Sequence, residues 1–178
     1  MSEQSPKPVF LLGLPGVGKS SSGRRLAGVL GYRFADLDRI LQEKTGMTVA
    51  EFFTARGEIA FRKAEHQALT ETEWTGIVLA TGGGTACFFE NMEWMIAHGV
   101  TVYLEAPLRT LRQRIEASQN ERPLFSGLSE NALEQKLSEL LQERKMFYEK
   151  AALRWEVLRE STDAFAERLL KFNASDFG

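Results

Sequence analysis

The chain has 178 residues, 43% of them hydrophobic and 26% charged, which suits one globular domain with a substantial core. Its formal net charge of −2 gives no support for nucleic-acid binding, so any anion site must be a local cluster of Arg and Lys side chains. The single cysteine, Cys87, excludes an internal disulfide and a cysteine-based zinc site, and we expect it to be buried as a small apolar residue.

The first residues of the chain do not resemble a signal peptide. Residues 1–8 are polar, and no apolar run approaches the roughly 20 residues that a membrane-spanning helix needs. We therefore expect a flexible N-terminus over residues 1–8, no contact with membranes or nucleic acid, and a cytoplasmic protein. We also expect a monomer.

The first predicted strand, residues 9–12, runs into a glycine-rich turn and then into a predicted helix over residues 19–30. The turn, GLPGVGKS over residues 13–20, fits the pattern G-x-x-x-x-G-K-[ST] at every fixed position. Glycines let the backbone approach an anion, and the N–H groups of the turn and the positive end of the helix attract phosphate. Lys19 would reach the β- and γ-phosphates and Ser20 would ligate Mg²⁺. This motif indicates a nucleotide site; a glycine-rich turn that binds nothing is the alternative.

The second predicted strand covers residues 32–35 and leads into Asp36 and Asp38. We interpret these two carboxylates as part of an extended segment and expect them to point in opposite directions. We expect one of them to support the Mg²⁺ shell and the other to accept a hydrogen bond from a substrate hydroxyl. Aspartates are also common in exposed turns, and spacing alone does not decide between the two interpretations.

Three predicted helices follow, separated by Gly46 and Gly57, over residues 39–44, 49–55 and 58–70. The next strand, residues 77–80, leads into Thr81 and three consecutive glycines. Bare backbone amides at this place would let a substrate lie directly against the chain, although a wide turn is an equal alternative. A second phosphate-site strand would ordinarily end in an acidic metal ligand, which this strand lacks.

The second half of the chain continues the alternation of helices and strands. Its predicted elements are helix 90–98, strand 100–104, a helix opened by Pro107, loop 120–129, helix 131–150, strand 155–158 and helix 163–172. Such alternation implies a parallel sheet with helices on both faces, and ligands of such sheets bind beyond the carboxyl ends of the strands. The glycine-rich turn, the two aspartates and the triple glycine each follow a strand, so we expect them to share one edge of the sheet.

Three arginines are candidates for the positive charge that a phosphoryl-transfer site needs. Arg62 lies on a predicted helix, Arg122 precedes a proline in the polar loop, and Arg144 lies on the long helix. A guanidinium group suits carboxylates and phosphates because it donates hydrogen bonds in a planar fork. Any single arginine is more often a surface residue, and spacing does not select these three.

The ordered motifs GLPGVGKSS, FADLD, GEIAFR, ATGGG, ERPLF and ERKMFYEKAA resemble those of the shikimate kinases over nearly the whole chain. The glycine-rich turn is generic, whereas the set of FADLD, GEIAFR and ATGGG, in this order and at these separations, is much more specific. The resemblance implies a three-layer α/β/α P-loop kinase fold, like that of nucleoside monophosphate kinases, in one domain over residues 1–178. It also implies a five-stranded parallel sheet and a mobile lid at about residues 120–129. ATP and shikimate would be the substrates and Mg²⁺ the cofactor.

The resemblance further implies roles for residues of the nucleotide site. ATP would be wrapped by Gly16, Val17, Gly18, Lys19, Ser20 and Ser21. Ser20 would bind Mg²⁺ directly, and Asp36 would touch it through water. Arg122 matches the lid arginine that closes onto the phosphates, and Arg114 resembles, more loosely, an arginine that lies along adenine.

On the acceptor side, Asp38 matches the aspartate that binds shikimate hydroxyls and orients or deprotonates the attacking one. Arg62 and Arg144 match the arginines that hold the substrate carboxylate. The acceptor wall would be formed by Gly82, Gly83 and Gly84, with Gly83 as the direct contact. The implied catalytic residues are therefore Lys19, Asp38 and Arg122.

Two other functions stay open at the level of the sequence. A small kinase for another hydroxylated acid, such as gluconate, would also use a glycine-rich turn and carboxylate-binding arginines. A non-catalytic module that senses ATP and regulates a partner would need only the first of these. The triple glycine and GEIAFR favour shikimate over another acid, and the full set of acceptor residues argues against the sensor.

Overall fold

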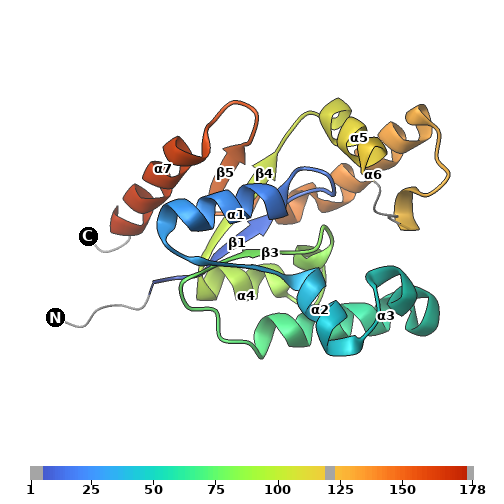
Figure 1. Ribbon diagram of the computed structural model, residues 1–178, viewed down its shortest axis with the longest axis horizontal. Helices are drawn as coiled ribbons and strands as arrows, with labels where there is room; N and C mark the ends of the chain where they lie inside the picture. Colours follow the sequence, from blue (N-terminus) through green and yellow to red (C-terminus); the bar gives the residue numbers. More distant parts are fainter. Residues whose placement is uncertain (1–5, 119–122, 176–178) are drawn as a thin grey trace.

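The computed structural model of the chain describes residues 6–118 and 123–175. Its centre is one sheet of five parallel strands in the order β2-β3-β1-β4-β5 (Figure 1). The strands are β1 (Val9–Leu12), β2 (Arg33–Asp36), β3 (Ile77–Ala80), β4 (Val100–Glu105) and β5 (Leu153–Glu156). The predicted α/β class with a five-stranded parallel sheet is confirmed.

Helices cover both faces of this sheet. They are α1 (Lys19–Leu30), α2 (Leu37–Thr45), α3 (Val49–Thr70), α4 (Asn91–His98), α5 (Leu108–Ala117), α6 (Glu130–Tyr148) and α7 (Thr162–Ser175), with short 3₁₀ helices η1 (Thr85–Cys87) and η2 (Pro123–Phe125). In Figure 1, α1 and α7 lie together on one face of the sheet, and α4 lies on the opposite face. No helix in the part of the chain that the structure describes is long and apolar enough to cross a membrane.

The core follows from the composition of the strands. Every residue of β1 and β3 is buried, and both strands are continuous apolar runs, as expected for a parallel sheet covered on both faces. At the edge of the sheet, the Trp155 ring of β5 stacks on Phe165 of α7 with ring centroids 4.4 Å apart. These contacts fix the sheet and its helices as one body around the central strand β1.

The described residues ahead of β1 are hydrogen-bonded to the sheet region. Gly76 donates its backbone N–H to the carbonyl of Pro6, and Val100 donates to that of Pro8, both at 2.9 Å. These residues belong to the segment 1–8 for which a flexible N-terminus is predicted. Residues 1–5 of that segment lie outside the described residues.

Three local features differ from the sequence-based prediction. Asp38 does not lie on an extended segment, because α2 begins at Leu37, directly after β2. The last strand covers Leu153–Glu156 rather than residues 155–158. The two helices predicted on either side of Gly57 form the single segment α3, which is kinked at Gly57, where φ is 79°.

Candidate active site

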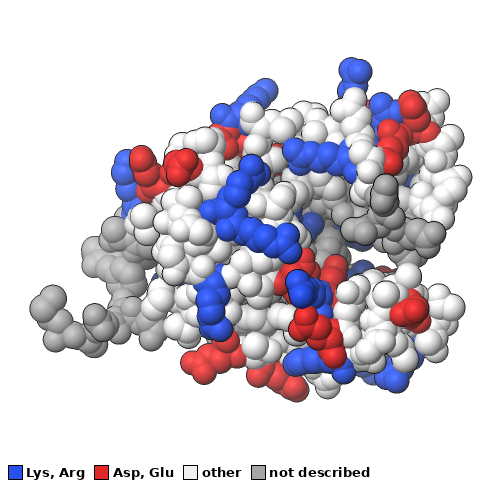
Figure 2. Space-filling view, viewed as in Figure 1, with Lys and Arg blue, Asp and Glu red and all other residues white. Residues whose placement is uncertain are grey.

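The loops that follow β1, β2 and β3 meet at the carboxyl ends of these parallel strands. Residues 82–84, the glycine segment, follow β3. Pro15, in the loop after β1, lies beside this segment, since a Cβ added at Gly83 would be 3.0 Å from the Pro15 side chain. On the face drawn in Figure 2, the surface is notched between the region of α2 and α3 and the region of α5 and α6, with acidic and basic side chains at its border. The predicted shared edge is therefore present.

The loop after β1 has the backbone of an anion cradle. Gly16 and Gly18 adopt φ values of 84° and 97°, a left-handed region that other residues enter only with strain. Lys19 folds back over the loop, and its Nζ donates to the carbonyl oxygens of Gly13 at 2.7 Å and Leu14 at 3.2 Å. The ammonium group therefore lies above the turn at the start of α1.

Arg114 of α5 packs against the same loop. Its Nη1 donates to the carbonyl oxygen of Val17 at 2.8 Å. A Cβ added at Gly18 would lie 3.3 Å from that Nη1 atom. Because α5 follows β4 along the chain, this arginine brings a second element of the fold to the glycine-rich loop. Arg114 therefore contacts the glycine-rich loop, and the contact with adenine that the resemblance implies stays a prediction.

Ser20 and Asp36 join the first helix to the end of β2. The Ser20 hydroxyl donates to Asp36 Oδ2 at 2.6 Å. The other carboxylate oxygen of Asp36 caps α2 by accepting from the backbone N–H groups of Asp38 and Arg39. A hydroxyl and a carboxylate side by side are the hard oxygen donors that suit Mg²⁺. Within residues 6–118 and 123–175, no group of three or more His, Cys, Asp or Glu side chains is arranged to hold a metal.

Asp38 lies in the first turn of α2 with its carboxylate against the glycine segment, because a Cβ at Gly82 would be 3.1 Å from Asp38 Oδ1. Burial, and then the charges of Glu65 and Asp36, raise the pKa of Asp38 to about 6. The positive charges of Lys19 and Arg62 oppose this rise in pKa. The expectation that Asp36 and Asp38 point in opposite directions along an extended segment is wrong in its reason. Side chains two residues apart in a strand share one face, and here Asp36 is the N-cap of α2 while Asp38 lies in its first turn.

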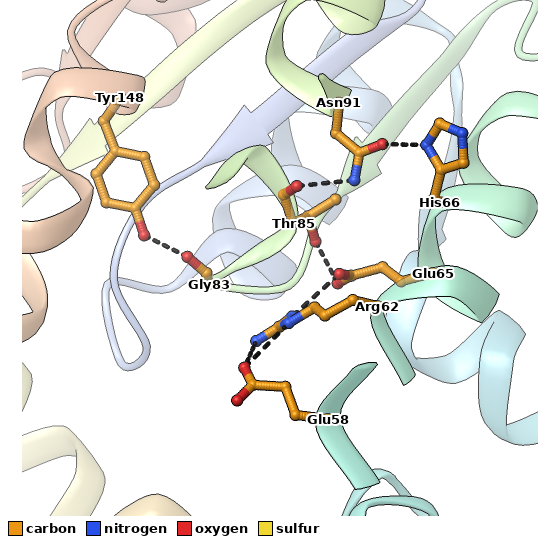
Figure 3. A network of polar contacts seen from close by, with 8 residues as sticks. All are labelled: Glu58, Arg62, Glu65, His66, Gly83, Thr85, Asn91 and Tyr148. Carbon is orange, nitrogen blue, oxygen red and sulfur yellow. Dashed lines mark hydrogen bonds and ion pairs between the residues drawn. The ribbon is translucent and has the colours of Figure 1, made fainter. Parts of the chain in front are cut away.

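A buried ion pair supports the other side of the pocket (Figure 3). Arg62 Nη1 is 3.0 Å from Glu65 Oε2, and Arg62 Nη2 is 3.3 Å from Glu58 Oε1. Glu65 is fully buried and also accepts a hydrogen bond of 2.5 Å from the Thr85 hydroxyl. Since a buried carboxylate is costly without partners, these donors offset the burial of Glu65, and the ion pair holds Arg62 in one orientation.

The same network continues to α4. The Asn91 side-chain amide donates to the carbonyl oxygen of Thr85 at 2.9 Å, so its oxygen faces the other way, toward His66. His66 Nδ1 is 2.7 Å from that oxygen, which assigns the proton to Nδ1. The network thereby fastens the start of η1, just after the glycine segment, to α3 and α4.

Aromatic rings surround the Arg62 guanidinium. Its Cζ atom lies 4.6 Å from the ring centroid of Phe88, 5.4 Å from that of Phe61 and 5.8 Å from that of Phe53. These distances are within the range of cation–π attraction. Phe88 is followed by two residues with left-handed φ angles, Phe89 at 49° and Glu90 at 58°. The Arg62 guanidinium is therefore in contact with both carboxylates and aromatic rings.

The long helix α6 supplies the remaining wall. A Cβ added at Gly83 would lie 3.0 Å from Arg144 Nη1, and Tyr148 donates its hydroxyl to the Gly83 carbonyl oxygen.

Cys87 is half-buried rather than buried, which corrects the expectation from the sequence. Burial raises the pKa of the Cys87 thiol, although the charges of Arg144 and Arg62 lower it.

Most of the residues singled out in the sequence converge on this site. Those brought together are Lys19, Ser20, Asp36, Asp38, Arg62, Gly82, Gly83, Gly84 and Arg144, with Arg114 on the glycine-rich loop. Arg122 lies outside the described residues, as does part of the predicted lid. Sequence reasoning missed Glu65, Thr85, Asn91 and Tyr148. A signal existed only for Glu65, which follows Arg62 by three residues and so shares its helix face.

Fold and site together define a class of protein. The strand order, the glycine-rich loop between β1 and α1, and the adjoining pocket of buried carboxylates and guanidinium groups are those of a P-loop kinase for a small molecule. The family model of shikimate kinase matches residues 15–173. The chain belongs to the shikimate kinase family.

Individual relatives agree with this assignment. A shikimate kinase of Parabacteroides distasonis is 38% identical over 159 residues, which are 89% of this chain and 92% of that protein. The crystal structure of shikimate kinase from Bacteroides thetaiotaomicron has a TM-score of 0.87 and 33% identity, and the match covers 94% of this chain and 98% of the other. The structure of shikimate kinase from Acinetobacter baumannii in complex with shikimate has a TM-score of 0.83 and 36% identity, over 96% and 94% of the two chains.

Proposed function

We propose that the protein transfers the γ-phosphoryl group of ATP to the 3-hydroxyl of shikimate, giving ADP and shikimate 3-phosphate for chorismate and aromatic amino-acid synthesis. The observation that carries this proposal is the convergence of Asp38, Arg62 and Arg144 around the glycine segment, beside the phosphate loop. One carboxylate and two guanidinium groups match an acceptor that bears hydroxyls and a carboxylate. The curated relatives, which are shikimate kinases, support the same acceptor.

The nucleotide would lie on the loop after β1. We assign the phosphates to the backbone of residues 16–21, with Lys19 leaving the loop carbonyls to reach the β- and γ-phosphates. Arg114 would lie beside the nucleoside. Arg122, in a lid at about residues 120–129, would close onto the phosphates and exclude water from the transferring group.

Ser20 and Asp36 fit a Mg²⁺ ion, Ser20 as a direct ligand and Asp36 through water. Their oxygens already lie 2.6 Å apart, which is a hydrogen bond that the ion and its water would replace. Bound Mg²⁺ would neutralise part of the charge on the β- and γ-phosphates. The protein's own contribution is to hold both oxygens at the start of two helices, α1 and α2.

The acceptor would lie between α3, α6 and the glycine segment. Arg62 and Arg144 would hold its carboxylate, and the backbone of residues 82–84 would form its wall. Asp38 would orient the attacking hydroxyl and accept its proton. A carboxylate whose pKa is about 6 is still ionised at neutral pH and is a stronger base than an ordinary aspartate. We further propose that the chain acts as a cytoplasmic monomer of one domain, residues 1–178.

The direct test is ATP-dependent ADP release by the purified protein with shikimate and with a panel of related acids that includes gluconate. We expect turnover with shikimate and mass-spectrometric detection of shikimate 3-phosphate. Lys19→Met should abolish turnover, and Arg62→Lys should raise the KM for shikimate about tenfold or more while leaving the KM for ATP near the wild-type value, because the bidentate fork is lost but the charge partner of Glu65 is kept.

Two outcomes would replace the proposal. Faster turnover with another acid than with shikimate would make the protein a kinase for that acid. Tight binding of ATP with no ADP release for any acid would make it a non-catalytic ATP sensor. An Arg62→Lys enzyme with an unchanged KM for shikimate would show that the acceptor lies elsewhere.

A further inference from the structure

Tyr148 is a buried tyrosine whose polar end is turned to the glycine segment. It is the last residue of α6, its side chain is 1% exposed, and its hydroxyl donates to the backbone carbonyl oxygen of Gly83 (Figure 3). Its ring packs against that of Tyr103 on β4, with centroids 5.1 Å apart. A single hydroxyl group thus joins the long helix to the wall of the acceptor pocket.

This hydrogen bond fixes the direction of one peptide group. In a trans peptide, the C=O of one residue and the N–H of the next point in opposite directions. Because the Gly83 carbonyl points to α6, the N–H of Gly84 points away from α6. That N–H makes no hydrogen bond to another backbone group in the described part of the chain, so it is free to donate to a ligand.

The same tyrosine is adjacent to the guanidinium of Arg144, one helical turn earlier on α6. Arg144 Nη1 and the Pro15 ring both lie 3.0 Å from the place of a Cβ at Gly83, so Gly83 is held between α6 and the phosphate loop. Burial raises the pKa of the Tyr148 hydroxyl above its usual range, although the charge of Arg144 opposes the rise, so the hydroxyl keeps its proton and remains a donor.

We propose that Tyr148 is a positioning residue for the acceptor. Its hydroxyl holds the Gly83–Gly84 peptide and the Arg144 side chain in one arrangement, in which an amide donor and a guanidinium group converge on the same ligand. Tyr148 touches neither substrate. This inference rests on the proposed function, because it concerns the same acceptor pocket.

The test compares two single hydroxyl deletions in adjacent rings. Tyr148→Phe should raise the KM for shikimate by about fivefold or more, as expected for loss of one buried hydrogen bond that orients the ligand's partners, and should leave the KM for ATP unchanged. Tyr103→Phe removes the same group from the neighbouring buried ring on β4, and it should leave both KM values within about twofold. Circular dichroism confirms that both variants are folded.

A double-mutant cycle with Arg144→Lys distinguishes a positioning role of Tyr148 from an unspecific effect on the packing of the protein. The double variant carries both Tyr148→Phe and Arg144→Lys. If Tyr148 acts through Arg144 and Gly83, the rise in its KM for shikimate will be smaller than the product of the rises in the two single variants. Tyr148→Met, whose flexible side chain adapts to a buried site, is the second variant without the hydroxyl and should show the same split between the two KM values.

The outcomes distinguish this inference from the proposed function. If the wild-type protein phosphorylates shikimate and both hydroxyl-free variants keep its KM for shikimate, or if the KM for ATP rises equally, Tyr148 is only structural and the inference is wrong. If the wild-type protein prefers another acid, the proposed function fails, and the same cycle with that acid decides the role of Tyr148.

Discussion

Asp38 carries its charge at a place where burial and two neighbouring carboxylates disfavour it. Its pKa is raised from 3.8 to about 6, so between these pH values the folded protein binds a proton that the unfolded chain has lost. Folding stability therefore falls as pH rises from about 4 to about 6, and the full cost, on the order of 3 kcal/mol, is present above pH 6.

We therefore expect Asp38→Asn to be more stable than the wild type at pH 8 and to lose most of its activity. The gain in the free energy of unfolding should shrink as pH falls below 6 and be mostly lost at pH 4, where Asp38 is neutral in the folded protein and about half protonated in the unfolded chain. Urea unfolding at pH 4, 6 and 8 measures this. A gain that is equal at all three pH values would mean that the charge of Asp38 is not its origin.

Single residues were predictable where a motif named them. Asp38 and Arg62 could be selected because their motifs, FADLD and GEIAFR, occur in order. Asn91 could not, since a buried asparagine looks like a surface residue until the fold supplies its partner Thr85. A satisfied buried polar group has no sequence pattern of its own.

At the scale of elements, the approach of α1 to the sheet depends on a missing side chain. A Cβ at Gly23 would lie 2.6 Å from the Phe34 ring and 2.9 Å from Leu11, whereas a Cβ at Gly28, five residues further along α1, would meet nothing within 4 Å. Gly23→Ala should therefore lower the free energy of unfolding by about 1–3 kcal/mol through overpacking.

Gly28→Ala is the matched control and should raise stability by about 0.5–1 kcal/mol, because alanine favours the helix at a site with space for its methyl group. Thermal and denaturant unfolding of both variants give the two signs. If both variants lost stability, the loss in Gly23→Ala could not be assigned to the close contact of Gly23 with the sheet.

Element types were easier to predict than their ends. β1 and β3 are continuous apolar runs, and their predicted bounds are confirmed. β5 is partly exposed at three of its four positions, so its apolar signal is weak, and the prediction placed it two residues too far along the chain. The start of α2 was missed because the extended segment was interpreted as continuing to Asp38, although an aspartate at the end of a strand can also be a helix N-cap, as Asp36 is.

At the scale of the whole molecule, a ligand that binds only the folded state should stabilise all of it. Shikimate at a concentration one hundred times its Kd adds about 2.7 kcal/mol, which corresponds to a rise in Tm of roughly 5–10 °C for a domain of this size. Lys19→Met should keep the shift caused by shikimate and lose much of the shift caused by ATP. Scanning calorimetry measures both, and loss of the shikimate shift in this variant would contradict separate subsites.

The convergence of the loops was predictable from the alternation of strands and helices, because parallel strands present their carboxyl ends at one edge of the sheet. The burial of the site's side chains was not predictable from the sequence. How far Arg62 is buried depends on the kink at Gly57 and on the turn through Phe89 and Glu90, which together place α3 and Phe88. Such features are decided by packing between segments that are far apart in the sequence.

The glycine segment is bordered by a different charged group at each position. One added methyl would reach Glu65 and Asp38 from residue 82, Arg144 from residue 83, or Arg62 from residue 84. Because these three residues lack side chains, the four charged groups can lie close to the backbone. Replacing any one of the three glycines would therefore displace at least one charged group. A change of acceptor would have to begin elsewhere in the pocket, because a side chain added in this short stretch would disturb the charged groups around it.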